Sequence, residues 1–170
     1  MKESFESQAE YPVRQLTSED WEKLRDVRTR AVLDSPQAFG DTSEQTQKRE
    51  EDVWKQWING SQNYVVEDKE NVVATATLRK DTDGVWIING VWTDPAYRGR
   101  GLSKKLLEKI FVEAKQKNLQ SIQLKVNSLQ TIAFDLYESL GFVEVERNSE
   151  QLMGDGQLHE QIVMEKQMSK

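Results

Sequence analysis

Cysteine is absent from this chain of 170 residues, histidine occurs once and proline three times. The lack of cysteine excludes disulfides, thiolate nucleophiles and cysteine-ligated metal sites. A single histidine, His159, also excludes most histidine-based metal centres and catalytic triads. We therefore expect no bound metal, and any chemistry must use other side chains or the backbone.

Long apolar runs are lacking too. No run approaches the roughly 20 residues that span a bilayer, and the first residues, MKESFESQAEY, contain no signal-peptide core. These absences predict a cytoplasmic protein without a membrane partner. The formal net charge of -6 argues against a protein that binds a phosphate backbone, so we expect no nucleic acid partner.

Linkers, repeats and low-complexity tracts do not interrupt the sequence. Its length fits one domain, and 36% hydrophobic residues are enough for a globular core rather than disorder. We expect a single domain over residues 1–170.

The spacing of apolar residues alternates between the periods of helix and strand. Ser18 is expected to cap a first helix that ends before Pro36. Thr42 or Ser43 is expected to cap a second helix, which Gly60 stops. The predicted elements are a strand (11–17), two helices (18–35 and 42–60), three strands (63–68, 71–80 and 84–93), a helix (101–118), a strand (121–126), a helix (129–140) and two strands (141–146 and 160–166).

The stretch VWTDPAYRGRGLSKKLLEKI, residues 91–110, crosses a strand-to-helix junction. Gly99 and Gly101 let the backbone turn there without a Cβ in the way. A helix start leaves four NH groups unpaired and carries about half a positive charge, which favours a pyrophosphate. Four cationic side chains lie at the same end: Arg98, Arg100, Lys104 and Lys105. The junction therefore predicts an anionic ligand.

Other interpretations of this junction fit less well. A glycine pair before a helix is frequently only a tight turn. A dinucleotide fingerprint would need a further glycine where Ser103 and Lys104 stand, and a parallel strand unit. The Walker A pattern is absent, and RGRG is a single copy flanked by amphipathic helix rather than an RNA-binding repeat.

This junction and LQSIQLKVNSLQTIAFDLYESLGFVEVE, residues 119–146, together resemble motifs A and B of the Gcn5-related N-acetyltransferase (GNAT) superfamily. The signature R-x-x-G-x-[GA] falls on Arg98, Gly101 and Ser103, with serine in place of the usual last residue. The patterns V-x-x-D-P-x-Y-R-G-x-G and A-x-x-L-Y-x-x-L-G-F both match. Two linked motifs at the right separation are more specific than either alone.

The resemblance implies an α/β (α+β) fold. Its central sheet is mixed, mostly antiparallel and six- to seven-stranded, flanked by about four helices in the order β-α-α-β-β-β-α-β-α-β-β. Acetyl-CoA, as co-substrate, would lie in a splay between the fourth and fifth strands. Its pantetheine would pair with the strand before the turn, and a backbone NH near residues 89–91 would polarise the thioester carbonyl.

The resemblance also implies particular cofactor-binding residues. The NH groups of residues 99–104 would hold the pyrophosphate. Gln130 stands where many members carry an asparagine, and nearby Asn127 could substitute for it. The expected cofactor-binding residues are Val91, Trp92, Thr93, Arg98, Gly99, Arg100, Gly101, Leu102, Ser103, Lys104, Asn127 and Gln130.

Tyr137 occupies the family position of a tyrosine that protonates the leaving thiolate. A phenol with a pKa near 10 is a suitable donor, although a tyrosine in an amphipathic helix can equally serve packing. No general base is obvious on the strands. Glu44, Asp83 and His159 are the candidates, and each has an alternative role as a cap, turn or solvated residue.

The predicted function is an acetyl-CoA-dependent N-acetyltransferase that moves an acetyl group to a primary amine of a small molecule or peptide by direct attack in a ternary complex. The alternative is a non-catalytic acetyl-CoA-binding sensor or interaction module. The first helices and the last hairpin would frame the acceptor, with Phe39, Trp54, Trp57 and Trp86 as candidate lining. The acceptor's identity and the oligomeric state stay open, with a homodimer among the alternatives.

Overall fold

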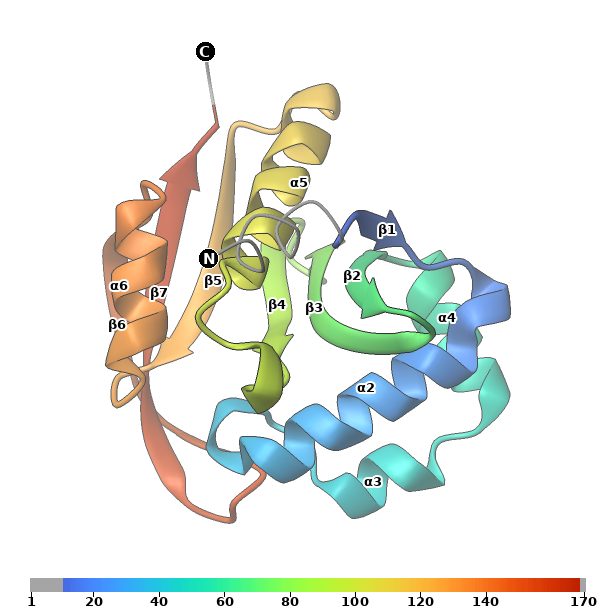
Figure 1. Ribbon diagram of the computed structural model, residues 1–170. Helices are drawn as coiled ribbons and strands as arrows, with labels where there is room; N and C mark the ends of the chain where they lie inside the picture. Colours follow the sequence, from blue (N-terminus) through green and yellow to red (C-terminus); the bar gives the residue numbers. More distant parts are fainter. Residues whose placement is uncertain (1–10, 169–170) are drawn as a thin grey trace, which may run out of the picture.

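A seven-stranded sheet forms the centre of the computed structural model, which describes residues 11–168. The strand order is β1-β2-β3-β4-β5-β7-β6, and every neighbouring pair is antiparallel except β4 and β5 (Figure 1). The predicted mixed, mostly antiparallel sheet is confirmed. The strands are β1 (Val13–Gln15), β2 (Gln62–Asp68), β3 (Asn71–Lys80), β4 (Trp86–Thr93), β5 (Ser121–Asn127), β6 (Val143–Leu152) and β7 (Leu158–Gln167).

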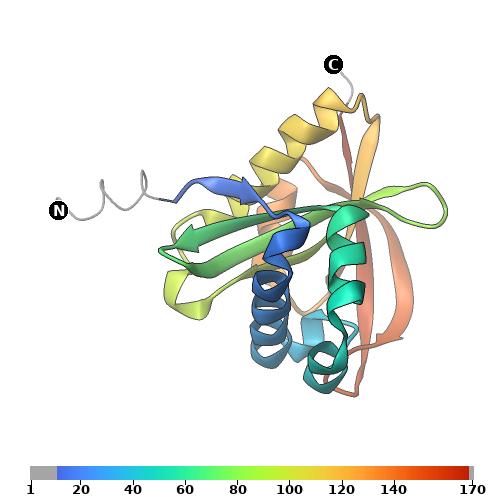
Figure 2. The same ribbon diagram turned by 90° about the vertical axis from the view of Figure 1, so that its right-hand side faces the viewer.

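Helices cover both faces of the sheet. The α-helices are α2 (Trp21–Asp34), α3 (Ser43–Lys48), α4 (Glu51–Asn59), α5 (Leu102–Gln116) and α6 (Thr131–Ser139), and short 3-10 turns lie at Ser18–Asp20, Pro36–Ala38 and Pro95–Tyr97. Figure 2 shows α2 and α4 side by side under the sheet with α5 above it. The helix α6 lies on the same face as α5, over the β5–β7–β6 half.

Each face has its own core because residues alternate along the strands. On the α5 side, Leu106 and Ile110 pack with Leu78 of β3 and Ile122 of β5. On the α2 side, the core contains Val27 of α2, Trp54 of α4 and Val65 of β2. Burial of each such side chain contributes about 1.5–3 kcal/mol, so the sheet is held from both faces.

The helix predicted over residues 42–60 is two helices, and this expectation of one continuous helix was wrong. Thr42 caps α3 as expected, since its hydroxyl accepts from the Gln45 NH at 3.1 Å. The helix then ends because Arg49 turns to an extended conformation and its guanidinium donates to the carboxylate of Asp41 at 2.8 Å. The ion pair of Arg49 with Asp41, which lies eight residues earlier in the sequence, therefore divides the predicted helix.

The start of the first helix also differs from the prediction. Ser18 lies inside the 3-10 turn and does not cap α2. Instead the NH of Thr17 donates to the carboxylate of Asp20 at 2.8 Å, so these two residues close the end of the turn. The helical segment thus begins with a 3-10 turn whose N-cap is Thr17, and α2 itself begins only at Trp21.

The strands β4 and β5 stay together for only two residue pairs, Ile87 with Gln123 and Ile88 with Leu124. Beyond these pairs β4 bulges. Two residues, Gly90 and Val91, face a single residue of β3, and Gly90 has a φ of +65°. A bulge of this kind bends a strand and increases its twist, so it turns β4 away from β5 and opens the sheet.

Candidate active site

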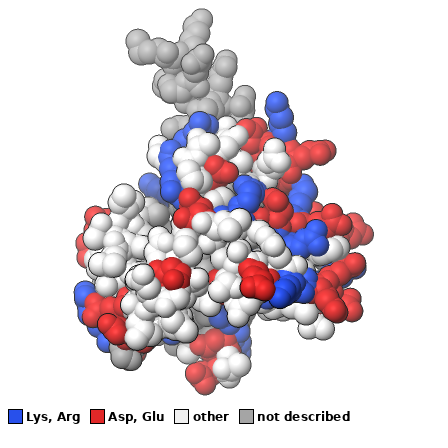
Figure 3. All heavy atoms as spheres, turned by 90° about the horizontal axis from the view of Figure 1, so that it is seen from below, with Lys and Arg blue, Asp and Glu red and all other residues white. Residues whose placement is uncertain are grey.

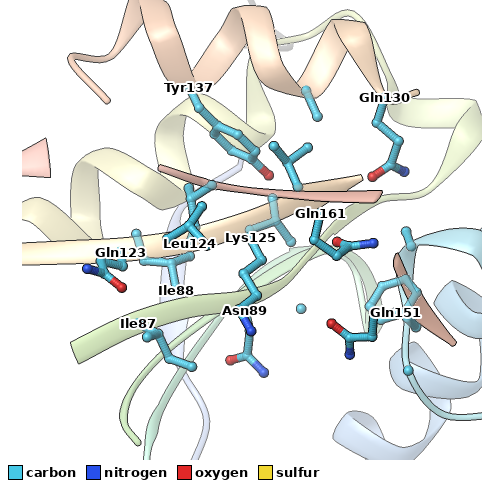
Figure 4. A pocket seen from close by; sticks show the side chains of 18 of the residues that line it. Ile87, Ile88, Asn89, Gln123, Leu124, Lys125, Gln130, Tyr137, Gln151 and Gln161 are labelled. Carbon is cyan, nitrogen blue, oxygen red and sulfur yellow. The ribbon is translucent and has the colours of Figure 1, made fainter. Parts of the chain in front are cut away.

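A cavity of about 410 Å³ lies where β4 and β5 separate (Figure 4). It is lined by residues from both faces of the sheet, so it joins the α6 side to the α2 side. The α6-side lining includes Leu124, Val126, Gln130, Ala133 and Tyr137. The α2-side lining includes Arg28, Phe39, Arg79, Asp81, Asn89, Gln123, Lys125, Gln151 and Gln161.

The turn before α5 offers a row of free backbone donors. The NH groups of residues 99–104 donate to no acceptor in the part of the chain that the structure describes. Gly99 and Gly101 have φ values of +80° and +76°, and a Cβ on either would meet no atom within 4 Å. Backbone donors at a helix start, with open space in front of them, suit a phosphate group.

The cationic side chains of this turn are partly committed to the fold. Arg98 donates through Nε to the Thr93 carbonyl at 3.0 Å and through Nη2 to the Asp34 carboxylate. Arg100 donates to the Tyr11 hydroxyl at 3.2 Å. Arg98 therefore ties the end of β4 to α2, while Lys104 is exposed beside the turn.

Further bonds fix the end of β4 itself. The hydroxyls of Thr93 and Ser103 lie 2.9 Å apart, and the indole NH of Trp92 donates to Asp34 at 2.9 Å. Burial raises the pKa of Asp34, but hydrogen bonds from Trp92, Ser35 and Arg98 outweigh it and hold the pKa below its usual range. Asp34 is therefore an anion that anchors the strand, and Trp92 offers a ligand only its backbone.

One backbone edge of β4 is unpaired where the strand bulges. Trp92 and Thr93 pair with Thr75 and Ala74 of β3. Toward β5, no residue of β4 beyond Ile88 has a ladder partner within residues 11–168. The segment 91–93 therefore has a free backbone edge of the kind that pairs with an extended ligand. The assignment of pantetheine to this edge stays a prediction from the family resemblance. The predicted cradle residues Gly99 to Lys104, with Leu102 buried beneath, continue directly from this edge.

Tyr137 projects from α6 with its hydroxyl directed into the cavity (Figure 4). Its ring is buried, with 7% of the residue exposed, and packs edge-on against Phe142 with the ring centroids 6.1 Å apart. Burial raises the pKa of Tyr137 to about 12. The phenol is therefore protonated across the working range of pH and serves as a hydrogen-bond donor.

Gln130 and Asn127 differ in their access to the cavity. Gln130 lines it at the start of α6. Asn127 is buried, its amide nitrogen donating to the Gln37 carbonyl at 3.2 Å and its amide oxygen accepting from the Leu129 NH at 2.9 Å. The Asn127 side chain thus joins β5 to the turn after α2, and only Gln130 offers its amide to the cavity.

The three candidate bases lie outside the cavity lining. Glu44 is exposed and pairs with Lys48 at 2.7 Å. Asp83 is exposed in the β3–β4 turn. His159 bonds through Nε2 to the carboxylate of Asp155 at 2.7 Å, across the β6–β7 turn. The structure thus gives each of these side chains a local partner or a place in solvent.

Of the four aromatic candidates for the acceptor side, Phe39 lines the cavity. Trp54 is fully buried in the α2-side core, and Trp57 packs under the guanidinium of Arg49 at 4.5 Å. Trp86 lies under the amine of Lys117, at 5.5 Å. The tryptophans at helical spacing, Trp54 and Trp57, therefore pack against other side chains and do not line the cavity.

The polar α2-side lining was largely missed from the sequence. Arg79, Gln123 and Lys125 occupy odd positions on β3 and β5, opposite to core residues such as Leu78 and Leu124. Alternation alone marks such residues as facing away from the core, without showing whether they face a cavity or solvent. The Oδ1 atom of Asn89 is also buried there without a hydrogen-bond partner among the described residues.

Residues 11–168 contain no group of three or more His, Cys, Asp or Glu side chains placed to hold a metal ion. Within the same residues, no helix has the length and apolar character needed to cross a bilayer.

The acetyltransferase (GNAT) family model matches residues 13–142, more than half of the chain. The chain therefore belongs to the acetyltransferase (GNAT) family and is an N-acetyltransferase by class.

Five curated relatives carry the name [ribosomal protein bS18]-alanine N-acetyltransferase. The protein of Haemophilus ducreyi is 29% identical over 98 residues, which cover 57% of this chain and 67% of that protein. The protein of Escherichia coli K12 is 31% identical over 82 residues, or 48% of this chain and 55% of that protein. The chain thus matches between about half and two thirds of these relatives' length.

Among solved structures, a putative acetyltransferase of Salmonella typhimurium with its cofactor acetyl-CoA superposes with a TM-score of 0.78. It is 20% identical, and the match covers 94% of this chain and 95% of that one. At this identity the likeness concerns the fold, and it confirms the GNAT architecture that the sequence predicted.

Proposed function

We propose that this chain, acting as one catalytic domain, transfers the acetyl group of acetyl-CoA to a primary amine at the opening between β4 and β5. The observation that carries the proposal is the cavity itself, because it joins the two faces of the sheet at the point where β4 bulges. Acetyl-CoA would lie on the α6 side and the amine would enter from the α2 side.

Two backbone segments would share the binding of acetyl-CoA. The free NH groups of residues 99–104 would hold the pyrophosphate, and the unpaired edge of residues 91–93 would hold the pantetheine. The bulge at Gly90 leaves backbone NH groups near the point where the thioester carbonyl would stand, where a donor stabilises developing negative charge.

Acetyl-CoA supplies the acetyl group as a thioester, and the nitrogen of the neutral amine bonds to the carbonyl carbon as the carbon–sulfur bond breaks. The amine loses one proton and the departing thiolate gains one. A thiol has a pKa of about 8.5, well below the pKa of about 12 of Tyr137. Tyr137 therefore keeps its own proton and donates a hydrogen bond to the sulfur. The proton that the thiolate gains is the one that the amine loses.

The acceptor would be the amine of a small molecule or a peptide. The names of the curated relatives state an alanine of ribosomal protein bS18 as their acceptor. This supports a primary amine next to a small side chain. The volume of the cavity, about 410 Å³, is sufficient for such a group together with the end of the pantetheine.

Release of free CoA thiol from acetyl-CoA, measured with a panel of small amines, amino acids and short peptides, tests this proposal. We expect at least one amine to raise thiol release far above the rate without amine, with an equal amount of acetylated amine formed. Tight acetyl-CoA binding without turnover on any amine would instead favour the sensor or interaction module.

A further inference from the structure

We propose that the acceptor amine carries an anionic group, a carboxylate in the simplest case, and that Arg28, Arg79 and Lys125 bind it. The inference rests on the proposed function, because it assigns the α2-side lining to the acceptor. It deepens that function by naming the chemical class of the substrate.

The charge of the cavity lining is the first observation. Its charged members are three cations and one carboxylate: Arg28, Arg79, Lys125 and Asp81. The whole chain has a net charge of -6, so the cavity reverses the sign of the molecule. On the face shown in Figure 3, acidic and basic side chains are interspersed, so the surface seen there has no broad basic patch that would explain the lining.

Arg28 is held as a rigid donor. Its Nη2 donates to Asp41 Oδ1 at 2.8 Å, and its guanidinium carbon lies 4.5 Å from the centre of the Phe39 ring. Its Nη1 has no hydrogen-bond partner among the described residues and stands 3.3 Å from where a Cβ of Gly90 would lie. A free guanidinium edge therefore faces the bulge, next to the reaction centre that we propose.

Asp41 does not cancel this positive charge. It accepts from Arg28 and from Arg49, each at 2.8 Å, and from the Thr46 hydroxyl at 2.9 Å. Two guanidinium groups thus share one carboxylate, and the cluster keeps one net positive charge. Because Asp41 is buried, it orients Arg28 without reaching the cavity.

Arg79 and Lys125 complete the cationic side. Arg79 pairs with Ile87, and Ile87 pairs with Gln123, so the three lie in one row across β3, β4 and β5. Neighbouring strands are about 4.8 Å apart, which puts the ends of the row roughly 10 Å apart. Lys125 follows two residues beyond Gln123 and points to the same face. Neither Arg79 nor Lys125 has an ion-pair partner within the described residues.

Nearby carboxylates are already engaged. Asp81 accepts through Oδ1 from the NH groups of Asp83 and Val85, at 2.8 and 2.9 Å. Glu165, beside Gln123 on β7, accepts from the side-chain amides of Gln123 and Gln167 at 2.8 and 2.9 Å. Among the described residues neither carboxylate forms an ion pair with Arg79 or Lys125, so these two cations would bind an anion from solution.

The phosphates of acetyl-CoA do not account for these cations. The turn that suits the pyrophosphate begins after Thr93, whereas Arg79 lies beside Ile87, six residues back along β4. Six strand residues span roughly 20 Å. The thioester end of acetyl-CoA carries no charge, so an anion near Arg79 and Lys125 must belong to the acceptor.

Matched acceptors test the inference. Steady-state thiol release would be compared for free amino acids against their amides, and for the dipeptide amides Ala-Glu against Ala-Gln, at one pH at which lysine is still cationic, with each kcat/KM corrected for the fraction of the amine that is neutral. A hydrogen bond to a charged group is worth about 1.5–3 kcal/mol, which corresponds to about 10- to 100-fold in affinity. We expect kcat/KM to favour the anionic member of at least one pair by about 10-fold, mainly through KM, with the preference weakening as salt rises.

Variants assign the preference to the cavity. In Arg79→Met and Lys125→Met the apolar stem remains, and we expect the anionic-to-neutral ratio of kcat/KM to fall about 10-fold. Lys80→Met is the matched control, because Lys80 is the next residue on β3, exposed and outside the cavity lining, and it should leave the ratio unchanged.

Turnover with equal kcat/KM for both members of every pair would overturn the inference and leave the proposed function intact. A charge preference that Lys80→Met reduces as much as Arg79→Met does would also overturn it, because the effect would then come from the general field of the protein. Absence of turnover on every acceptor would remove the proposed function, and this inference with it.

Discussion

The turn before α5 and the α2-side lining of the cavity are built in opposite ways. The turn is one short segment, residues 98–104, and its free donors are backbone NH groups. The α2-side lining gathers side chains from α2, β3, β4, β5, β6 and β7. A site made of contiguous backbone leaves a readable pattern of glycines in the sequence, whereas a site made of distant side chains does not.

The same difference governs how each region tolerates change. Ser103 replaces the usual small residue of the family signature, yet its NH group is still free and its hydroxyl bonds to Thr93 at 2.9 Å. A backbone site loses little by such a replacement. In the α2-side lining we propose that the side chains themselves bind the acceptor, so a replacement there should change the substrate rather than the binding of acetyl-CoA.

The largest effect is expected from Gly101→Val, which should abolish acetyl-CoA binding while the protein stays folded. Gly101 has a φ of +76°, which a β-branched residue adopts only with strain of about 1–3 kcal/mol. Its methyl groups would also stand before the free NH groups. Calorimetric titration with acetyl-CoA and circular dichroism would measure affinity and fold.

Gly156→Val is the matched control for that experiment. Gly156 has a φ of +78° and, like Gly101, no atom within 4 Å of an added Cβ, but it lies in the β6–β7 turn. It should show similar strain and normal affinity. Unchanged affinity in a folded Gly101→Val protein would end the assignment of the turn to the phosphates.

The next effect is expected from Tyr137→Phe, which removes the hydroxyl and keeps the ring. We expect kcat to fall by about 10- to 1000-fold, as for loss of a donor to the leaving group, with acetyl-CoA affinity retained. Tyr64→Phe is the control, because Tyr64 is a fully buried tyrosine in the same core and does not line the cavity. Undiminished kcat in Tyr137→Phe would reassign this tyrosine to packing.

The fold and the turn before α5 could be predicted from the sequence because both depend on local residue patterns. Alternation over residues 71–80 and 84–93 predicted the strands β3 and β4, and the glycines with the following apolar stripe predicted the start of α5. The divided second helix was missed because its cause, the bond from Arg49 to Asp41, depends on tertiary structure.

The candidate site was predicted mainly on its α6 side, and on the α2 side the sequence predicted Phe39 but none of the polar side chains of the lining. Tyr137 and Gln130 were found through the family pattern and do line the cavity. Arg28 and Arg79 follow no local pattern, since they come together only when β4 bulges and α2 packs under the sheet. Asn127 was within reach of the motif, but its amide is committed to Gln37 and Leu129, which no spacing rule could show.

A smaller effect is expected from Asp41→Asn, which addresses the α2-side lining alone. Burial raises the pKa of Asp41, but Arg28 and Arg49 outweigh burial and hold this pKa at about 2, below the usual range of an aspartate. Since the folded pKa is the lower one, the carboxylate contributes stability above pH 4 that is lost as the pH falls toward 2, about 2 kcal/mol in all. Urea unfolding from pH 7 to pH 2 would measure it.

In Asp41→Asn this pH-dependent part of the stability should be missing, and Arg28 should lose its fixed orientation. KM for the acceptor should rise several-fold while acetyl-CoA affinity stays unchanged, because the Asp41 carboxylate bonds to Arg28, Arg49 and Thr46 and to no residue of the α5 turn. A parallel loss of acetyl-CoA affinity would show that the turn before α5 and the α2-side lining are coupled through the fold. It would contradict their description as two separate binding regions.

The smallest effect is expected from His159→Gln. The imidazole bonds to Asp155 across the β6–β7 turn, and this contact lowers the pKa of the Asp155 carboxyl, so its partner is structural rather than a substrate. Glutamine can keep a hydrogen bond there, and kcat should change by less than about 2-fold. The rate should rise with pH as more of the acceptor amine becomes neutral, without a break between pH 6 and 7 of the kind an imidazole produces. A break in the wild-type profile that disappears in His159→Gln would instead bring the last hairpin to the reacting amine, and would make the acceptor side a catalytic surface as well as a binding one.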